Sequence, residues 1–395
     1  MSGRIYFDHA ATTAISPRAL EVVTEQMAVL GNPSSLHFDG RKVRDLVEEA
    51  REEIAHAIGS TPSEVIFTAS GTEANNSAIK GLFWHRAPRR VIVTTPIEHH
   101  AVADPIQWLA EHEGAVVREV AVDRDGAIDI ADLTRIVEAD RESIALVALI
   151  HTNNEIGTSI NDGEMKLIRS VLGEIPLHLD AVQSIGKVPF NFHGSGATSA
   201  AISAHKVGGP LGVAALLLRR GLDITPLLHG GGQERDIRSG TLNAPGIAGF
   251  AAAISESIER LEEHRAKIST LRKKLIAGIE RVIPDVRVNG RGDAPGILNI
   301  TFPESENEAS LLLFDSEGIS CSTGSACSQG LAQPSHVLLG IGMDVKDVNA
   351  TLRFSLSHLN TEDEIERFLA VVGDVVSGAR AAYRAKLPSV SGASS

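Results

Sequence analysis

Cysteine is scarce in this sequence: Cys321 and Cys327 are the only two cysteines in 395 residues. Two thiols cannot build the disulfide framework of a small secreted domain. They are also too few, at this spacing, for a zinc ribbon. We therefore expect both thiols to stay reduced, which is typical of a cytoplasmic protein, and we predict no metal site.

Long apolar runs and an excess of positive charge are also missing. No stretch reaches the roughly 18 apolar residues of a membrane span, and the first residues, MSGRIYFDHAATT, contain no apolar core of signal-peptide length. The 37 basic residues are outnumbered by 50 acidic ones, so the net charge is −13. A nucleic-acid footprint needs clustered Lys and Arg. This sequence therefore predicts neither a nucleic acid nor a membrane as a direct partner.

The first 220 residues alternate between short apolar runs and amphipathic helical stretches. Runs this apolar favour strands covered on both faces, and the alternation predicts an α/β layered sheet. In such sheets, ligands bind where strands end and helices begin. The expected strands are EVIFTA (64–69), RRVIVTT (89–95), SIALVALIHT (143–152), IPLHLDAV (175–182), ATSAAISAH (197–205) and GVAALLLRR (212–220).

The pattern changes after about residue 245. Apolar residues at three- and four-residue spacing predict one long helix through residue 283, which we interpret as the link between two domains. We expect a large domain over 15–260, and a small α+β domain formed by 1–14 together with 261–385. The tail, 386–395, has little to bury and is predicted to be disordered.

A lysine and a carboxylate follow two of the expected strands. Lys206 comes at the end of the strand in ISAHKVGG, and Asp180 ends the strand in IPLHLD. Alone, such a lysine would fit a surface turn and such an aspartate a helix N-cap. Together they match what pyridoxal phosphate requires, namely an amine for its aldehyde and an anion for its pyridinium nitrogen.

Two further strand ends carry suitable polar groups. In FTASGTEANN, the residues SGTE (70–73) start a helix, whose N-terminus suits a phosphate. The same pattern is also that of an ordinary capping box. His99, in EHH, could stack on a flat ring or serve only the local structure.

These segments resemble the cysteine desulfurases, within the class V aminotransferase group of pyridoxal phosphate enzymes. The resemblance extends over nearly the whole chain, from YFDHAATT (6–13) to LRFSLSH (352–358). It implies an α/β fold of the fold type I aminotransferase kind. That fold has a large domain with a mostly parallel seven-stranded sheet, and a smaller α+β domain. The intervening segments that carry the resemblance are GNPSSLH, FTASGTEANN, EHHAV, HTNNEIGT, LDAVQSIGK, SAHKVGGPLG, HGGGQERDIRSGT and CSTGSACS.

The resemblance also implies roles for single residues. Lys206 would form the Schiff base with the cofactor, and His99 would stack on its ring and help to move protons. The substrate carboxylate would bind Arg353, whose fork matches a carboxylate, with help from Asn154. The implied cofactor-binding residues are Gly71, Thr72, His99, Asn154, Asp180, Gln183, Ser203, His205, Lys206 and, from the second subunit of a homodimer, Thr241.

Cys327 matches the family's nucleophile, in a Gly-, Ser- and Ala-rich loop at about 318–335. The implied reaction converts L-cysteine into L-alanine and leaves a persulfide on Cys327. The loop resembles the longer, more mobile type of the family, which can carry sulfur to an acceptor. A thiolate is needed, so a proton acceptor is expected nearby, and His99 is the candidate. Cys321 is interpreted as a small apolar filler.

Other functions stay open on the sequence alone. A selenocysteine lyase or another pyridoxal phosphate β-lyase is the nearest alternative. A non-catalytic sulfur carrier would not need the intact Lys206 and Asp180, and a dehydrogenase reading of HGGGQ (229–233) lacks the strand–GxGxxG–helix context. The expected sulfur acceptor is an iron–sulfur scaffold, a tRNA-thiolating enzyme or a DNA-sulfur-modifying complex.

Overall fold

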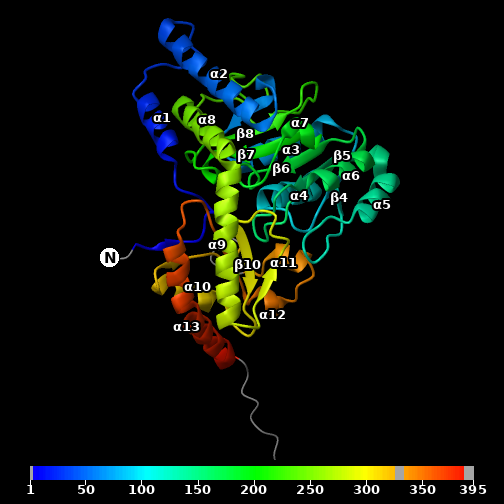
Figure 1. Ribbon diagram of the computed structural model, residues 1–395. Helices are drawn as coiled ribbons and strands as arrows, with labels where there is room; N and C mark the ends of the chain where they lie inside the picture. The colour runs from blue at the N-terminus through cyan, green and yellow to red at the C-terminus, as the bar shows by residue number, and fades with distance from the viewer. Residues whose placement is uncertain (1–2, 325–332, 387–395) are drawn as a thin grey trace, which may run out of the picture. The chain divides into compact units, whose positions relative to one another are not determined.

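The computed structural model describes residues 3–324 and 333–386 (Figure 1). Its contacts divide the chain into two compact units. The large unit comprises Ala11–Asn153 and Thr158–Glu263, and the small unit comprises Met1–Ala10, Asn154–Gly157 and His264–Ser395. The domain boundaries expected from the sequence, which differ slightly, stay a prediction.

The large unit contains a seven-stranded sheet in the order β2-β8-β7-β6-β5-β3-β4. Strands β7, β6, β5, β3 and β4 run parallel to one another, whereas β8 is antiparallel to both β7 and β2. The mostly parallel seven-stranded sheet is therefore confirmed. Its strands are β2 (Val65–Thr68), β3 (Val91–Thr94), β4 (Val116–Glu119), β5 (Ile144–Ile150), β6 (Leu177–Asp180), β7 (Ser199–Ser203) and β8 (Ala214–Leu218).

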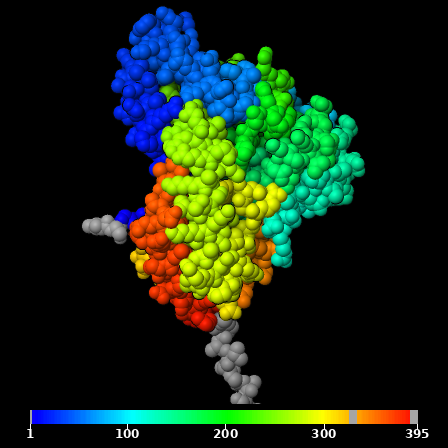
Figure 2. All heavy atoms as spheres, viewed as in Figure 1, coloured from blue at the N-terminus to red at the C-terminus, as the bar shows by residue number. Residues whose placement is uncertain are grey.

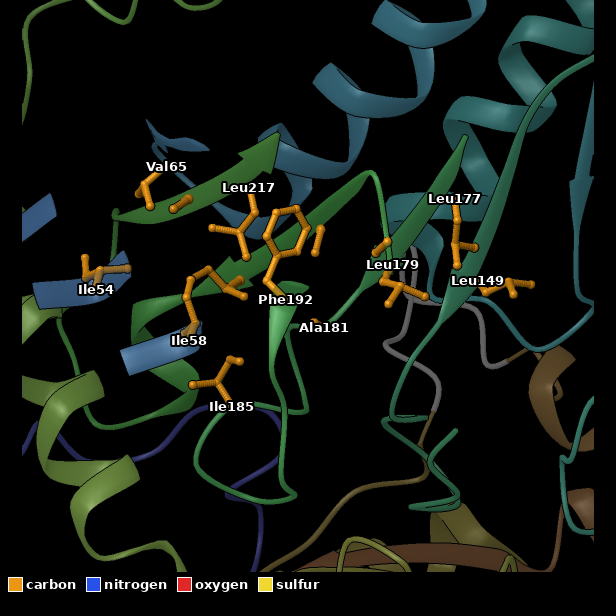
Figure 3. Packing of buried hydrophobic residues seen from close by; sticks show 14 of the residues in the cluster. Ile54, Ile58, Val65, Leu149, Leu177, Leu179, Ala181, Ile185, Phe192 and Leu217 are labelled. Atoms are coloured by element: carbon orange, nitrogen blue, oxygen red, sulfur yellow. The ribbon is translucent and has the colours of Figure 1, made fainter. Parts of the chain in front are cut away.

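Alternate residues of these strands enter two separate apolar cores. Val91 and Val93 pack into one cluster, while Ile92 between them packs into the other. Helices α2, α5, α6 and α8 supply side chains to the first cluster, part of which is seen in Figure 3. Helices α3 and α4 supply side chains to the second. Because helices cover both faces of the sheet, most of its strands are short runs of apolar residues.

The large unit begins with two helices and ends with a third that contacts both, α8 (Figure 1). Its α-helices are α1 (Pro17–Met27), α2 (Phe38–Ile58), α3 (Gly71–His85), α4 (His100–Glu113), α5 (Ile130–Asp140), α6 (Asp162–Leu172), α7 (Phe192–Ser195) and α8 (Ala244–Glu259). Its 3-10 turns are η1 (Pro62–Glu64), η2 (Arg141–Ser143) and η3 (Ala204–Lys206).

The small unit is an α+β structure with its own apolar core. Figure 2 shows α9 and α13 packed side by side, and a Cβ on Gly278 of α9 would lie only 2.3 Å from Leu369 Cδ1 of α13. The unit's strands are β1 (Ile5–Tyr6), β9 (Arg287–Asn289), β10 (Ile297–Thr301), β11 (Ile319–Ser320) and β12 (Thr351–Ser355). Its helices are α9 (Leu261–Val282), α10 (Asn307–Ser316), α11 (His336–Gly340), α12 (Val345–Val348) and α13 (Glu362–Lys386).

The prediction of one helix from 245 to 283 is wrong in one respect. The helix is interrupted at Arg260, whose backbone (φ −106°, ψ 13°) ends α8, and α9 starts at Leu261. The segment contains neither Gly nor Pro at this point, so nothing in the pattern marks the break. Among the residues that the structure describes, no helix is both long and apolar enough to cross a bilayer.

Candidate active site

Asp180 is a buried carboxylate at the end of β6, between β5 and β7. Its Oδ2 accepts a hydrogen bond from Asn75 Nδ2 at 3.0 Å, and its Oδ1 accepts one from the Val182 N–H at 3.0 Å. Burial raises the pKa of Asp180, while the charges of His99 and Lys206 and the two hydrogen bonds oppose that rise. The N-cap interpretation is wrong, because the next helix, α7, begins only at Phe192; Oδ1 instead accepts from the backbone N–H two residues on, in a turn.

Lys206 and His205 lie in η3, directly after β7. The Lys206 ammonium donates to the Ala11 carbonyl oxygen at 2.6 Å, and the His205 ring lies 3.2 Å from Thr12 Oγ1. Burial, together with the positive charges of Lys206 and Lys187, lowers the pKa of His205 to about 4. His205 is therefore a neutral hydrogen-bonding group at pH 7, while the lysine supplies positive charge close to Asp180.

The start of α3 lies beside the same strand ends. A Cβ on Gly71 would come within 2.8 Å of Val182 Cγ2 and 3.6 Å of Ser203 Cβ, so only glycine fits easily there. Ser70 caps the helix by accepting from the Glu73 N–H at 3.1 Å. Capping and anion binding are thus compatible here. Gly71, the first residue of the helix, is therefore close to Ser203 of β7, and Thr72 follows it.

His99 is the N-cap of α4, and its Nδ1 accepts from the Ala101 N–H at 3.0 Å. His99 is exposed in the single chain, and its charge opposes the rise in the pKa of Asp180. Its neighbour Glu98 is buried and accepts a 2.6 Å hydrogen bond from Thr95 Oγ1. Burial, with Asp180 adding to the effect, raises the pKa of Glu98 to about 8.

Glu98 makes stability depend on pH. Its native pKa of about 8 exceeds its unfolded value of 4.5, so its contribution is fully present below pH 4.5 and is lost as the pH rises through 8. Glu98→Gln removes this loss. Each pKa unit corresponds to about 1.4 kcal/mol, so the Tm of the variant relative to the wild type should rise by about 5 °C between pH 5 and 9. Glu111→Gln, on the exposed side of α4, should show no such trend. Parallel Tm–pH curves for Glu98→Gln and the wild type would contradict this prediction.

Arg353 lies in β12 of the small unit and is buried. It donates to Asp8 Oδ1 at 2.8 Å and to the Asn154 carbonyl oxygen at 3.0 Å. Its Nε and the Oδ1 of Asn154 are buried without a hydrogen-bond partner. Buried polar atoms are rarely left unsatisfied. This guanidinium and amide therefore suit a small ligand that carries an acceptor and a donor, such as an amino acid.

Gln183 and Thr241 are the two remaining predicted residues of the large unit. Gln183 is buried just beyond β6, and its Oε1 accepts from Lys187 Nζ at 2.5 Å. Thr241 is exposed and follows Gly240, whose φ of +123° favours glycine. Gln183 thus lies next to the Asp180 region, whereas the role of Thr241 depends on a second subunit.

Of the two cysteines, only Cys321 lies within the described residues. Cys327 and the tail beyond residue 386 lie outside the described residues. Cys321 directly follows β11 and packs against the core of the small unit. Burial, followed by the charge of Asp8, raises the pKa of the Cys321 thiol to about 12. This agrees with the apolar filler that the sequence predicted.

Two polar side chains next to Asp180 are absent from the residues predicted from the sequence. Asn75 and His178 are both buried, and His178 Nε2 lies 2.8 Å from Asn75 Oδ1. A usable signal was present, because His178 interrupts an apolar strand two residues before Asp180 and hence on the same side.

The large-unit residues fit pyridoxal phosphate. Asp180 is a buried carboxylate with a raised pKa, so it gains from a cationic partner such as a pyridinium nitrogen. A lysine amine lies near it, and a helix start with a tight glycine lies beside Ser203. Asp180, Lys206, His99, Gly71, Thr72, Ser203, His205 and Gln183 would hold the group.

Comparison with known proteins gives a consistent result. The family model for aminotransferase class-V matches residues 5–368. An IscS-like cysteine desulfurase of Mycobacterium tuberculosis is 45% identical over 384 residues, which is 95% of this chain and 97% of that protein. A solved NifS-like protein has a TM-score of 0.87 at 35% identity and covers 95% of this chain and 99% of its own. The structure of SspA in complex with cysteine has a TM-score of 0.76 at 32% identity, covering 90% and 100%.

These likenesses confirm the fold class, the cofactor and the type of enzyme that the resemblance predicted. They extend across both units, since the family model alone matches residues 5–368. This chain belongs to the class-V aminotransferase family and, within it, to the pyridoxal-phosphate-dependent cysteine desulfurases.

Proposed function

We propose that this enzyme converts L-cysteine into L-alanine and stores the released sulfur as a persulfide on Cys327. In this reaction the Cys327 thiolate bonds to the substrate sulfur while the substrate's Cβ–S bond breaks, and Cβ takes up a proton to give alanine. The observation that carries the proposal is the environment of Asp180. This carboxylate is buried, and Lys206 and His99 lie close enough to lower its pKa.

The large-unit residues act on the cofactor and on protons. When bound, pyridoxal phosphate supplies an electron sink and a reactive carbonyl for amines. Asp180 provides the anion for its ring nitrogen. Lys206 Nζ holds and moves the proton at the substrate's α-carbon. His99 covers the ring and takes the proton from the attacking thiol.

The remaining assignments concern orientation. Neutral His205 and the start of α3 are suited to hydrogen-bond a phosphate without adding a second cation. In the small unit, Arg353 binds the substrate carboxylate through a guanidinium that already has one buried N–H to offer. Gly71, Thr72 and Ser203 complete the phosphate site, while Gln183 and Asn154 contact the ring.

We also propose that the enzyme is a homodimer in which Thr241 joins the partner's phosphate site. Several large apolar side chains near the start of the chain are exposed, among them Leu30, Leu36 and Phe38, each by 70% or more. A second copy would shield them from water. We place the enzyme in the cytoplasm, where thiols stay reduced, with the domain boundaries 15–260 and 1–14 with 261–385.

The stored sulfur needs a protein acceptor. We propose an iron–sulfur scaffold, a tRNA-thiolating enzyme or a DNA-sulfur-modifying complex as its recipient. The net charge of −13 supports a protein intermediary over direct contact with nucleic acid.

Mapping the sulfur tests this proposal. Anaerobic incubation with sulfur-labelled L-cysteine should give alanine and about one labelled sulfur per chain, which tandem mass spectrometry should place on Cys327. Cys327→Ser should lose both products and keep the absorbance of bound cofactor. Label on Cys321, or free sulfide without protein-bound sulfur, would refute the assignment. Alanine formed from selenocysteine and not from cysteine would identify a selenocysteine lyase instead.

A further inference from the structure

Beneath Asp180, three buried side chains form a continuous line of hydrogen bonds in the large unit. Asn75, in the second turn of α3, donates from Nδ2 to Asp180 Oδ2 at 3.0 Å. His178 Nε2 lies 2.8 Å from Asn75 Oδ1, and His178 Nδ1 lies 2.9 Å from Ser199 Oγ. Asn75 and His178 are at most 1% exposed, and Ser199 is fully buried.

The direction of each bond follows from the carboxylate. A carboxylate accepts hydrogen bonds, so Asn75 must turn its NH₂ group towards Asp180 and its carbonyl oxygen towards His178. His178 must then carry its proton on Nε2 and accept from the Ser199 hydroxyl on Nδ1. Burial lowers the pKa of His178 to about 3, so the ring stays neutral and keeps this single tautomer.

The backbone holds the line in place. His178 and Asp180 are two residues apart on β6, so their side chains leave the same side of the strand. Ser199 is the residue of β7 paired with His178 in the parallel ladder. Sheet register therefore sets the His178–Ser199 bond, and α3, which begins at Gly71, brings Asn75 to the other nitrogen.

We propose that His178 and Asn75 are positioning residues for Asp180: His178, fixed by Ser199, locks the amide of Asn75 so that it donates to Asp180 and keeps that carboxylate oriented and anionic. The inference rests on the proposed role of Asp180 towards the cofactor's ring nitrogen. Without His178, the Asn75 amide could turn over and present its oxygen to the carboxylate, which would repel the negative charge.

The other groups that face Asp180 do not replace this bond. Val182 occupies Oδ1, His99 and Lys206 act through their charge, and Glu98 is a second buried carboxyl, whose own pKa Asp180 helps to raise. Among the hydrogen bonds of the described residues, Asn75 supplies the one side-chain donor to Asp180. Its loss should weaken cofactor binding and lower the pH at which the bound cofactor's ring nitrogen gives up its proton.

Asn75→Leu, His178→Gln and Ser199→Ala test the inference in the holoenzyme. For Asn75→Leu we expect the Kd of pyridoxal phosphate to rise about tenfold and kcat to fall about 10- to 100-fold. The pH dependence of the cofactor's absorbance should shift as well. His178→Gln, whose amide can still donate to Asn75 Oδ1, should show a smaller loss than Asn75→Leu. Ser199→Ala, three hydrogen bonds from Asp180, should change the spectrum in the same direction by about threefold less.

Two comparisons separate the possible outcomes. Asn76→Ala, on the same helix, removes an amide that bonds only the Thr72 carbonyl of its own turn, and should keep the wild-type spectrum. If all three variants lower Tm and leave cofactor affinity and spectrum unchanged, the residues are merely structural and the inference is overturned. If Asp180→Asn itself leaves spectrum and kcat unchanged, the proposed role of Asp180 fails instead. Should Asn75→Leu not fold, Ser199→Ala alone decides.

Discussion

Replacing Lys206 by alanine is expected to lower kcat for alanine release from L-cysteine by about 10⁴-fold or more. The lysine has two proposed tasks, the covalent link to the cofactor and proton transfer at the substrate. Proton transfer alone accounts for about 10²- to 10⁴-fold in enzymes. Its ammonium donates to the Ala11 carbonyl oxygen, a backbone group that water can satisfy instead, so the fold should survive. Steady-state alanine assays and Tm measurements on the holoenzyme give both values.

Lys206→Arg is the matched variant. An arginine keeps positive charge near Asp180 but cannot form a Schiff base with an aldehyde. It should therefore be as inactive as the alanine variant, and borohydride should no longer fix the cofactor to the protein. Activity within tenfold of the wild type in Lys206→Arg would show that the lysine acts only through its charge, and the assignment would fall.

Glu234→Ala should be the most destabilising of the substitutions considered, at about 3–5 kcal/mol. Glu234 and Arg51 form a bidentate ion pair at 2.8 Å, with exposed side-chain fractions of 1% and 3%. Glu234 also accepts from the Phe67 N–H of the edge strand β2. Its removal leaves the buried guanidinium with only the half-exposed Glu48 as a charged partner, and it leaves the strand N–H without its acceptor. The segment that carries Thr241 would lose this anchor to β2.

The same arginine provides the control. Glu48 pairs with Arg51 at 3.0 Å, but half of its side chain is exposed. Glu48→Ala should therefore cost at most about 1 kcal/mol. Urea unfolding of the two variants at matched cofactor saturation measures the difference. Adding Arg51→Leu to Glu234→Ala should restore part of the stability, because no charge is then left alone. Equal losses from Glu48→Ala and Glu234→Ala would contradict the argument.

Apolar runs predicted most of the central sheet because both of its faces are covered. Residues 64–69, 143–152 and 197–205 each contain the strand that was expected. The edge strand β4, with the sequence VVRE, is largely exposed and has no such run, so it was missed. The break at Arg260 was missed for a different reason. It comes from the backbone of one residue, and the helical periodicity continues across it.

Site residues could be predicted where the type of residue alone indicates its chemistry. They could not be predicted where the role of a side chain depends on a hydrogen-bond partner far away in the sequence. Asp180 and Lys206 could be found because each lies at or just after the end of an apolar strand that the sequence predicts. The link between Asn75 and His178 joins residues 103 positions apart, and either side chain alone is compatible with many roles. The Arg51–Glu234 pair joins residues 183 positions apart, and no local sequence pattern indicates it. Such choices of partner are made only when helices and sheet pack together.

The partly buried thiol of Cys321 has a practical consequence for thiol chemistry. With a pKa of about 12, Cys321 is almost wholly protonated at neutral pH. Reagents and oxidants that require a thiolate should therefore react with it very slowly. Any stoichiometric modification of the native chain thus reports on residue 327 alone. With Cys321 protonated, we expect the sulfur of the proposed Cys327 persulfide to leave by transfer to another molecule or by reduction.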